Sequence, residues 1–192
     1  DHYHDYFTYK IPFLKYLDKE AVKDADIVLT VSDSLNSYVK KFRKQPTFTI
    51  QNGIELSQFK KIDKKMARKL LKLPPGKIII YVGEISKFKG VHILVDAFIE
   101  VKTAVPDAHL LLSGKILDNI DIKQDAIIYE RYPKRQEVLF ALKAADVAVL
   151  PNVRNVLTEY GFPYKLLEYM AVGLPVVATK LGDASMILSQ HD

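Results

Sequence analysis

Cysteine is absent from the 192-residue sequence, and long apolar runs are absent as well. Without cysteine the protein can form no disulfide framework and no thiolate metal site, so packing must supply its stability, and a reducing compartment is permitted. No apolar run approaches the roughly 18 to 20 residues that a membrane-spanning helix needs. The polar and aromatic segment that starts at Asp1 also lacks the apolar core of a signal peptide. We therefore expect a cytoplasmic protein.

Apolar and charged residues are both plentiful. Hydrophobic residues make up 48% of the chain and charged residues 27%, which is typical of a soluble globular protein with a core. The formal net charge of +5 favours anionic partners. Much of the excess charge precedes the break at 74–76, in Lys60, Lys61, Lys64, Lys65, Arg68, Lys69 and Lys72. This stretch is typical of a solvated helix face. The alternative interpretation is a protein surface that is held against the inner face of an acidic membrane.

Short apolar runs alternate with helical patterns after residue 76. Residues 77–82 form an isoleucine-rich run between two glycines, which predicts a buried parallel strand. Apolar residues then recur at helical spacing from Val91 to Phe98, and Pro106 ends that helix. The same patterns predict further strands at 109–113, 127–129, 146–150 and 175–179, and further helices at 133–144 and 163–172. The fold class is therefore α/β, a Rossmann-like parallel sheet with helices on both faces.

The first part of the chain has too few elements for a domain of its own. Strands are predicted at 25–31 and 47–51, and a helix at 33–42 begins at a cap formed by Ser32 or Asp33. The sequence lacks an initiator methionine and shows no strand or helix pair after Thr179, so we expect both ends to have been cut from a larger protein. Residues 1–58 would be the remnant of a preceding domain, and residues 59–192 an incomplete Rossmann-like domain.

Four polar loops fall on the carboxyl edge of the predicted sheet, where parallel sheets bind their ligands. These loops are residues 83–90, 114–115, 132–133 and 152–163. The first loop contains Lys87 and Lys89 and ends at Gly90, where a predicted helix begins. Unpaired N–H groups at a helix N-terminus favour an anion, although an ordinary strand-to-helix turn has the same sequence features.

Segment 162–170 combines a buried apolar stripe with two unusual charges. Pro163 suits the first helical position. Lys165 opposes the helix dipole, at a cost of about 0.3 to 1 kcal/mol, so an anion beside it would explain its presence. Glu168 falls between apolar residues, where a carboxylate needs partners such as ligand hydroxyl groups, unless it lies exposed on the helix flank. The buried stripe consists of Leu166, Leu167 and Met170.

Five segments together resemble family-four glycosyltransferases. Residues 81–90 resemble the family's glycine-led loop that ends in Lys-Gly, and residues 165–179 resemble its most specific signature. Residues 25–32 and 50–54 are similar to the end of the family's acceptor domain and to its crossover, and residues 145–151 also fit. The matches keep the family's order and spacing.

This resemblance implies a retaining glycosyltransferase of GT-B architecture, which moves a sugar from a nucleotide-diphosphate donor to a glycan or lipid-linked acceptor. The chain would hold the donor-binding C-terminal domain after the tail of the acceptor domain, and the isolated fragment would be inactive. The resemblance also implies no metal and no cofactor beyond the donor. The sequence agrees, because it has no His/Cys cluster and no Asp-x-Asp motif on a suitable loop. We expect no nucleic-acid partner, because aromatic and basic residues are not interleaved on one surface.

Two catalytic residues follow from the resemblance when it is carried over by position. Lys89 would contact the diphosphate, and Glu168 would bind the ribose hydroxyl groups. Gly83 would let the phosphates or the sugar approach the backbone. His4 is the candidate residue for positioning the acceptor. The alternative interpretation is that His4 is an ordinary surface residue near the terminus.

The rest of the donor site follows from the resemblance in the same way. Tyr132 and Pro133 would lie near the base, and Phe162 would face the transferred sugar. The remaining candidate donor-binding residues are Pro163, Lys165 and Leu166.

Two positions depart from the family pattern. Glu84 stands where the family usually has arginine, so Lys87 or Lys165 could replace that phosphate contact. Tyr160 stands where the first of two paired glutamates is expected, and Glu159 could shift inward to replace it. These departures favour the alternative function, a non-catalytic nucleotide- or sugar-phosphate-binding domain or a degenerate regulatory domain.

Overall fold

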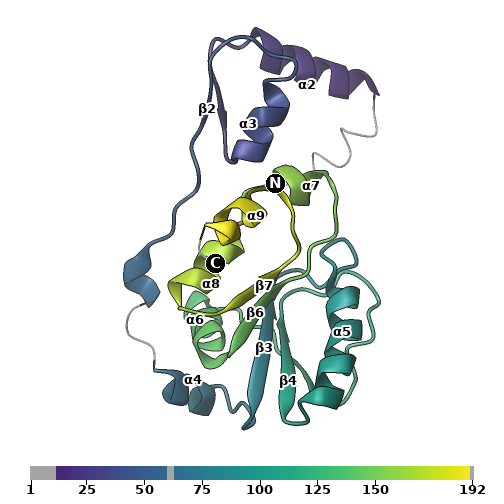
Figure 1. Cartoon of the computed structure of the whole chain (residues 1–192), viewed down its shortest axis with the longest axis vertical. Coiled ribbons are helices and arrows are strands. Elements are labelled where there is room, and N and C mark those ends of the chain that lie inside the picture. The colour runs from purple at the N-terminus through teal and green to yellow at the C-terminus, as the bar shows by residue number, and fades with distance from the viewer. Residues whose placement is uncertain (1–11, 60–62, 191–192) are drawn as a thin grey trace.

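The computed structural model describes residues 12–59 and 63–190. This part of the chain contains a two-stranded sheet near the N-terminus and a five-stranded sheet after residue 76 (Figure 1). The predicted α/β fold class is confirmed. His4, Lys60 and Lys61 lie outside the described residues.

The five-stranded sheet has the order β5-β4-β3-β6-β7, and every neighbouring pair of strands is parallel. The pairing of β3 with β4 runs from Lys77 opposite Ala108 to Val82 opposite Ser113. Each strand predicted for this region is present, within one residue of its predicted bounds. The strands are β3 (Lys77–Val82), β4 (Ala108–Ser113), β5 (Ile127–Tyr129), β6 (Val147–Leu150) and β7 (Val176–Ala178).

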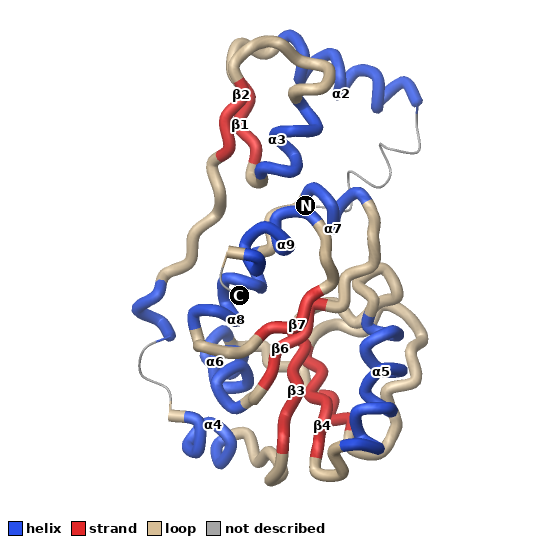
Figure 2. The backbone as a smooth tube through the Cα atoms, viewed as in Figure 1, coloured by secondary structure: helices blue, strands red, loops and turns tan. Residues whose placement is uncertain are grey.

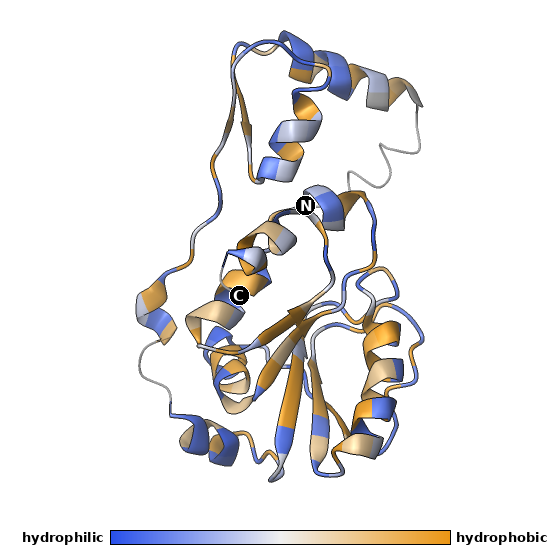
Figure 3. Ribbon diagram, in the orientation of Figure 1, coloured by the Kyte–Doolittle hydropathy of each residue, from blue (hydrophilic) through white to orange (hydrophobic). Residues whose placement is uncertain are grey.

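Helices cover both faces of this sheet (Figure 2). Side chains alternate along β3, so Ile78 and Ile80 lie in one core and Tyr81 lies in the other. The Tyr81 core is closed by α5 (Val91–Ala104), and the opposite core by α6 (Arg135–Ala144) and α8 (Tyr164–Ala171). Figure 3 shows the apolar residues along these strands and helices. No helix in the described ranges is both long enough and apolar enough to cross a membrane.

The N-terminal unit is a small layer of two strands and two helices. β1 and β2 pair in parallel, with Leu29 opposite Phe48, and both side chains are more than half exposed. Ser32 caps α3, because its Oγ accepts a hydrogen bond from the Leu35 N–H at 3.1 Å. The predicted strands and helix are confirmed with shorter bounds, and α2 is an addition to them. The elements are α2 (Pro12–Asp24), β1 (Val28–Thr30), α3 (Asp33–Val39) and β2 (Thr47–Thr49).

Two short helices, η1 (Leu56–Phe59) and α4 (Lys64–Leu70), follow the N-terminal unit and lead to the sheet. Lys64 and Arg68 of α4 both bind the carboxylate of Asp146, at 2.6 and 2.7 Å. The interpretation of the basic stretch as a solvated helix face is therefore wrong for Arg68, whose side chain is 22% exposed, whereas the Lys64 side chain stays 43% exposed while it is paired. They are structural, because they hold α4 against the segment that leads into β6.

Besides α2, two more helices lie where the sequence predicted none. α7 (Val156–Tyr160) interrupts the predicted loop 152–163, and α9 (Gly182–Ser189) follows Thr179, so the expectation of no further helix is wrong. Ile187 and Leu188 of α9 pack against the core on the α6 and α8 side. A helix this short is stabilised by packing more than by its own propensity, which is why its sequence does not reveal it.

Candidate functional site

Three of the predicted polar loops pack backbone against backbone at the carboxyl edge of the sheet. A Cβ atom on Gly114, after β4, would overlap the carbonyl oxygen of Gly83, after β3. A Cβ atom on Gly90 would likewise overlap the carbonyl oxygen of Pro151, after β6. Gly90 and Gly114 have positive φ angles of 75° and 151°, which favour glycine. These close contacts bring the loops after β3, β4 and β6 together at this edge of the sheet.

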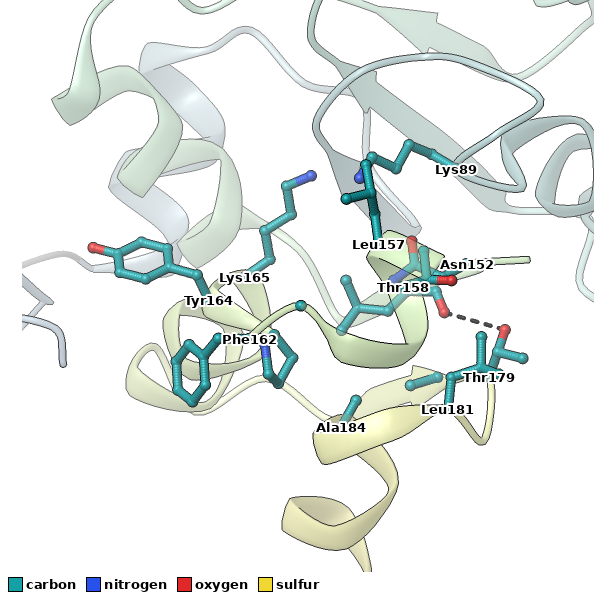
Figure 4. A pocket seen from close by; sticks show the side chains of 14 residues that line it. Lys89, Asn152, Leu157, Thr158, Phe162, Tyr164, Lys165, Thr179, Leu181 and Ala184 are labelled. Carbon is teal, nitrogen blue, oxygen red and sulfur yellow. Dashed lines mark hydrogen bonds between the residues drawn. The ribbon is translucent and has the colours of Figure 1, made fainter. Parts of the chain in front are cut away.

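A cavity of about 190 Å³ lies at this edge (Figure 4). Lys89 reaches it from the loop before α5, and Lys165 reaches it from the first turn of α8. Figure 4 shows the two amino groups entering the same space. Phe162 and Pro163 also line the cavity, whereas none of the described residues that line it is acidic. Two lysines without an opposing carboxylate in the cavity make it suited to an anion.

The charge of Lys165 is only partly compensated by its surroundings. Burial and, secondly, the charge of Lys89 lower the pKa of Lys165 to about 8, although Glu84 and Glu168 oppose this shift. The Lys165 ammonium lies 5.5 Å from the centre of the Tyr81 ring. An anion in the cavity would favour the charged form of Lys165 and raise its pKa again.

Lys165 is held in place by the packing of α8 on the sheet. The hydroxyl group of buried Tyr169 accepts a hydrogen bond from the Val82 N–H at 3.2 Å, which ties α8 to β3. A Cβ atom on Gly83 would overlap the Lys165 amino group, so this glycine makes room for the lysine. The Leu166 side chain is fully buried in the core and does not line the cavity, and a contact of this residue with the donor stays a prediction.

Glu168 lies one helical turn after Lys165 and is 5% exposed. The alternative of an exposed glutamate on the helix flank is therefore wrong. Its Oε1 lies 2.5 Å from Nη1 of Arg135, the first residue of α6. A buried carboxylate is costly without such a partner. Sequence reasoning missed Arg135, because the pairing depends on the packing of α6 beside α8 and leaves no local signal.

Lys165 is the second cation beside Lys89. Lys87, the other candidate, is exposed and does not line the cavity, and its N–H donates to Asp118 Oδ2 at 2.6 Å. Glu84 lies close enough to Lys165 to favour the charged form of the lysine. The acidic residue Glu84 therefore stabilises the positive charge of Lys165.

Tyr160 and Glu159 contact other parts of the protein. The Tyr160 ring packs on Tyr38 of α3, with 4.9 Å between the ring centres. The Glu159 carboxylate binds Arg154 at 2.8 Å, and neither Glu159 nor Tyr160 lines the cavity. The alternative in which Glu159 shifts inward is therefore wrong, because Arg154 binds its carboxylate.

Tyr132 and Pro133 follow β5 and do not line the cavity that Lys89 and Lys165 enter, which we call the lysine cavity. Tyr132 is half-buried against the core, and its hydroxyl group has no hydrogen-bond partner within the described ranges. Burial, followed by the charges of Glu130 and Glu137, raises the pKa of Tyr132 to about 12. Pro133 is exposed. The contact of these two residues with a base stays a prediction.

The sequence analysis also missed polar residues that line the cavity, namely Asn152, Thr158 and Thr179. Thr158 belongs to a capping box at the start of α7. The Thr158 N–H donates to Asn155 Oδ1, and the Asn155 N–H donates to Thr158 Oγ1, both at 3.0 Å. The pattern Asn-x-x-Thr is a variant of the known capping-box signal and could have predicted α7.

The family model described as "Glycosyl transferases group 1" matches residues 76–192. TuaC of Bacillus subtilis (strain 168), which carries the name of a teichuronic acid biosynthesis glycosyltransferase, is 32% identical over 90% of this chain and 43% of its own length. The N-acetyl-alpha-D-glucosaminyl L-malate synthase of Bacillus anthracis is 27% identical over 94% of this chain and 48% of its own length. The chain thus spans less than half the length of these two relatives.

Two solved structures share the fold. Sucrose-phosphate synthase from Thermosynechococcus elongatus superposes with a TM-score of 0.71 at 22% identity, covering 91% of this chain and 46% of that chain. HepE from Anabaena, in complex with UDP-glucose, superposes with a TM-score of 0.69 at 20% identity, covering 91% of this chain and 50% of that chain. At these identities the likeness concerns the fold, and it confirms a Rossmann-like domain of the GT-B type.

Proposed function

The chain belongs to the group 1 glycosyltransferase family, and from this premise we propose that it is the donor-binding half of a glycosyltransferase. The whole protein moves a sugar from a nucleotide-diphosphate donor to a glycan or lipid-linked acceptor, with retention of configuration and without a metal ion. Residues 1–58 belong to the acceptor side and the crossover, and residues 59–192 bind the donor.

The proposal rests on two amino groups that share one cavity. The buried carboxylate of Glu168 does not line this cavity itself, but it lies close enough to act on the charge of Lys165. Lys89 and Lys165 supply two positive charges for a diphosphate. Glu168 lies three residues after Lys165 in α8, so the two side chains project from the same face of this helix. The Glu168 carboxylate then accepts hydrogen bonds from the ribose hydroxyl groups.

Charge on the leaving group explains how these residues would promote transfer. As the bond between sugar and diphosphate breaks, the departing nucleoside diphosphate gains negative charge. Cations that are already in place stabilise this charge without reorganisation. Lys89 and Lys165 meet this condition, because a loop that ends at α5 and the packed helix α8 hold them. The bound diphosphate keeps Lys165 protonated, because an opposite charge raises the pKa of an amine.

Metal independence is supported by the same two lysines, which bring to the diphosphate the positive charge that a metal ion would supply. Lys165 also replaces the arginine that the family resemblance led us to expect at Glu84.

We also propose that the protein is cytoplasmic and contacts the inner face of a membrane peripherally. Lys65, Lys69 and Lys72 stay exposed after Lys64 and Arg68 have bound Asp146. Exposed lysines favour contact with anionic lipid headgroups. Such contact would bring the enzyme to a lipid-linked acceptor.

Transfer of radiolabelled sugar by the intact protein tests the proposed function. UDP-, GDP- and ADP-sugars are supplied with lipid and glycan acceptors, with and without EDTA. We expect transfer from one donor class, unchanged by EDTA, into a product that keeps the anomeric configuration of the donor. Loss of transfer with EDTA, or inversion of configuration, would contradict the metal independence or the retention of configuration, respectively.

A non-catalytic nucleotide-binding domain is the second candidate function. It is favoured by Tyr160, whose ring packs on Tyr38 and brings no carboxylate to the cavity. Binding of a nucleoside diphosphate without sugar transfer by the intact protein would support this second candidate.

A further inference from the structure

Arg135 of α6 and Glu168 of α8 form an ion pair whose members differ in exposure. The two side chains are 44% and 7% exposed, respectively, and Nη1 of Arg135 lies 2.5 Å from Oε1 of Glu168. Within the described ranges, Arg135 is the one cation at ion-pair distance from Glu168. A carboxylate with so little contact with water needs a fixed partner. The orientation of the Glu168 carboxylate therefore depends on Arg135.

Stability of α6 does not explain an arginine at this position. Arg135 is the first residue of α6, where a positive charge opposes the helix dipole. Its guanidinium carbon lies 5.7 Å from the centre of the Phe59 ring, and Phe59 is 3% exposed. The guanidinium is thus held between an aromatic ring and a carboxylate. Arginine suits such a place better than lysine, because its planar group can contact a ring and a carboxylate together.

Glu168 retains capacity for a ligand while it is paired. An ionised carboxylate has two oxygens with about four acceptor sites, and the ion pair with Arg135 engages Oε1. Oε2 can therefore accept a hydrogen bond from a hydroxyl group while Arg135 holds the other oxygen.

Resting on the proposed function, we propose that Arg135 is a positioning residue for the nucleoside part of the donor. It holds the Glu168 carboxylate in the orientation that accepts hydrogen bonds from the ribose hydroxyl groups. Arg135 acts through Glu168, so its removal reduces the recognition of ribose more than the recognition of base or diphosphate. The measurable consequence is weaker discrimination between ribose and dideoxyribose nucleotides.

Isothermal titration calorimetry of the full chain with UDP, GDP and ADP, and with their 2′,3′-dideoxy forms, tests this proposal. We expect the wild-type chain to bind the ribose form of its preferred nucleotide about 10- to 100-fold more tightly than the dideoxy form. Arg135→Ala should lower this ratio to the value of Glu168→Gln and leave the affinity for the dideoxy form almost unchanged. The double variant should lose no further discrimination, and Arg135→Lys should keep part of it.

Lys134→Ala is the matched control. It removes a positive charge from the exposed residue before Arg135, and the ratio between ribose and dideoxy forms should stay at the wild-type value. Circular dichroism establishes that each variant is folded. Should Arg135→Ala fail to fold, the ratio of Arg135→Lys decides, because a purely structural arginine would leave that ratio unchanged.

Three outcomes would overturn the proposal. Arg135→Ala with the wild-type ratio, or with equal losses for both nucleotide forms, would show that Arg135 does not act through Glu168. Tighter binding of the ribose form by Arg135→Ala would show that Arg135 blocks Glu168. A wild-type chain that binds none of the nucleotides would remove the proposed function together with this proposal, whereas the first two outcomes leave the proposed function intact.

Discussion

The carboxylate of Asp183 binds the N-terminus of α3, where the N–H of Asp33 donates to Oδ2 at 2.8 Å. The N–H and hydroxyl of Ser34 donate to Oδ1 at 2.9 and 2.7 Å, and Asp183 is 1% exposed. A carboxylate is favourable at a helix N-terminus, because it pairs with unpaired N–H groups and with the positive end of the dipole. Asp183 thereby joins the N-terminal unit to the Rossmann-like domain through α9, a helix that also lines the lysine cavity through Ala184.

Replacement of Asp183 should destabilise the protein. Asp183→Ala leaves two partly buried N–H groups at the N-terminus of α3 without this partner, so we expect the free energy of unfolding to fall by about 1 to 3 kcal/mol. Asp183→Asn should lose less, because it keeps one carbonyl oxygen. Urea unfolding followed by circular dichroism measures the change. Ser189→Ala, on the exposed part of the same helix, serves as control, and an equal midpoint for Asp183→Ala and this control would refute the role of the contact.

The lowered pKa of Lys165 should make the stability of the folded protein depend on pH. Its pKa is about 8 in the folded protein, against 10.5 for an ordinary lysine. Below about pH 8 the charged lysine disfavours the folded state. Between about pH 8 and 10.5 the unfolded state binds more protons, so this unfavourable contribution to stability decreases as the pH rises.

Anion binding should show the opposite trend, because a diphosphate requires the protonated lysine. We expect the affinity for UDP, measured by calorimetry, to fall as the pH rises through about 8. Lys165→Arg should bind with a flatter pH profile, since its guanidinium stays charged. Identical profiles for the two proteins would mean that Lys165 does not contact the anion.

Loss of Lys89 should reduce transfer strongly. In the intact enzyme, Lys89→Ala should lower kcat roughly 100- to 1,000-fold, because it removes a fixed charge from the leaving group. Lys87→Ala is the matched control, since Lys87 is on the same loop but is exposed and outside the cavity. Steady-state kinetics with radiolabelled donor compares the two variants. Near-normal turnover of Lys89→Ala would remove Lys89 from the mechanism.

A methyl group at Gly83 should displace Lys165. A Cβ atom there would overlap the lysine amino group, and the φ angle of 148° favours glycine. We expect Gly83→Ala to lower both the melting temperature and the affinity for UDP. Gly53→Ala meets no atom within 4 Å and should change neither quantity. Thermal-shift assays with and without UDP compare them, and equal behaviour of the two variants would contradict the close packing at Gly83.

Local patterns predicted the five-stranded sheet and most of the helices that cover it. The isoleucine run that became β3 and the helical spacing from Val91 to Phe98 depend on burial that repeats within a few residues, so the sequence reveals them directly. The approach of Lys89 to Lys165 was also predictable. Both follow strands of a parallel sheet, and the carboxyl ends of such strands share one edge.

Contacts between distant segments lie outside any local pattern. The pairing of Arg135 with Glu168 requires α6 beside α8, and the pairing of Asp183 with α3 requires the N-terminal unit to lie over α9. The order of residues alone was enough for the family, through the resemblance of its motifs to those of known glycosyltransferases. It was also enough for the parallel sheet and the edge on which the two lysines lie, because these follow from short-range periodicity and chain direction. The partner of Glu168 and the existence of α9 were decided by three-dimensional packing, because each depends on side chains that only the complete fold brings together.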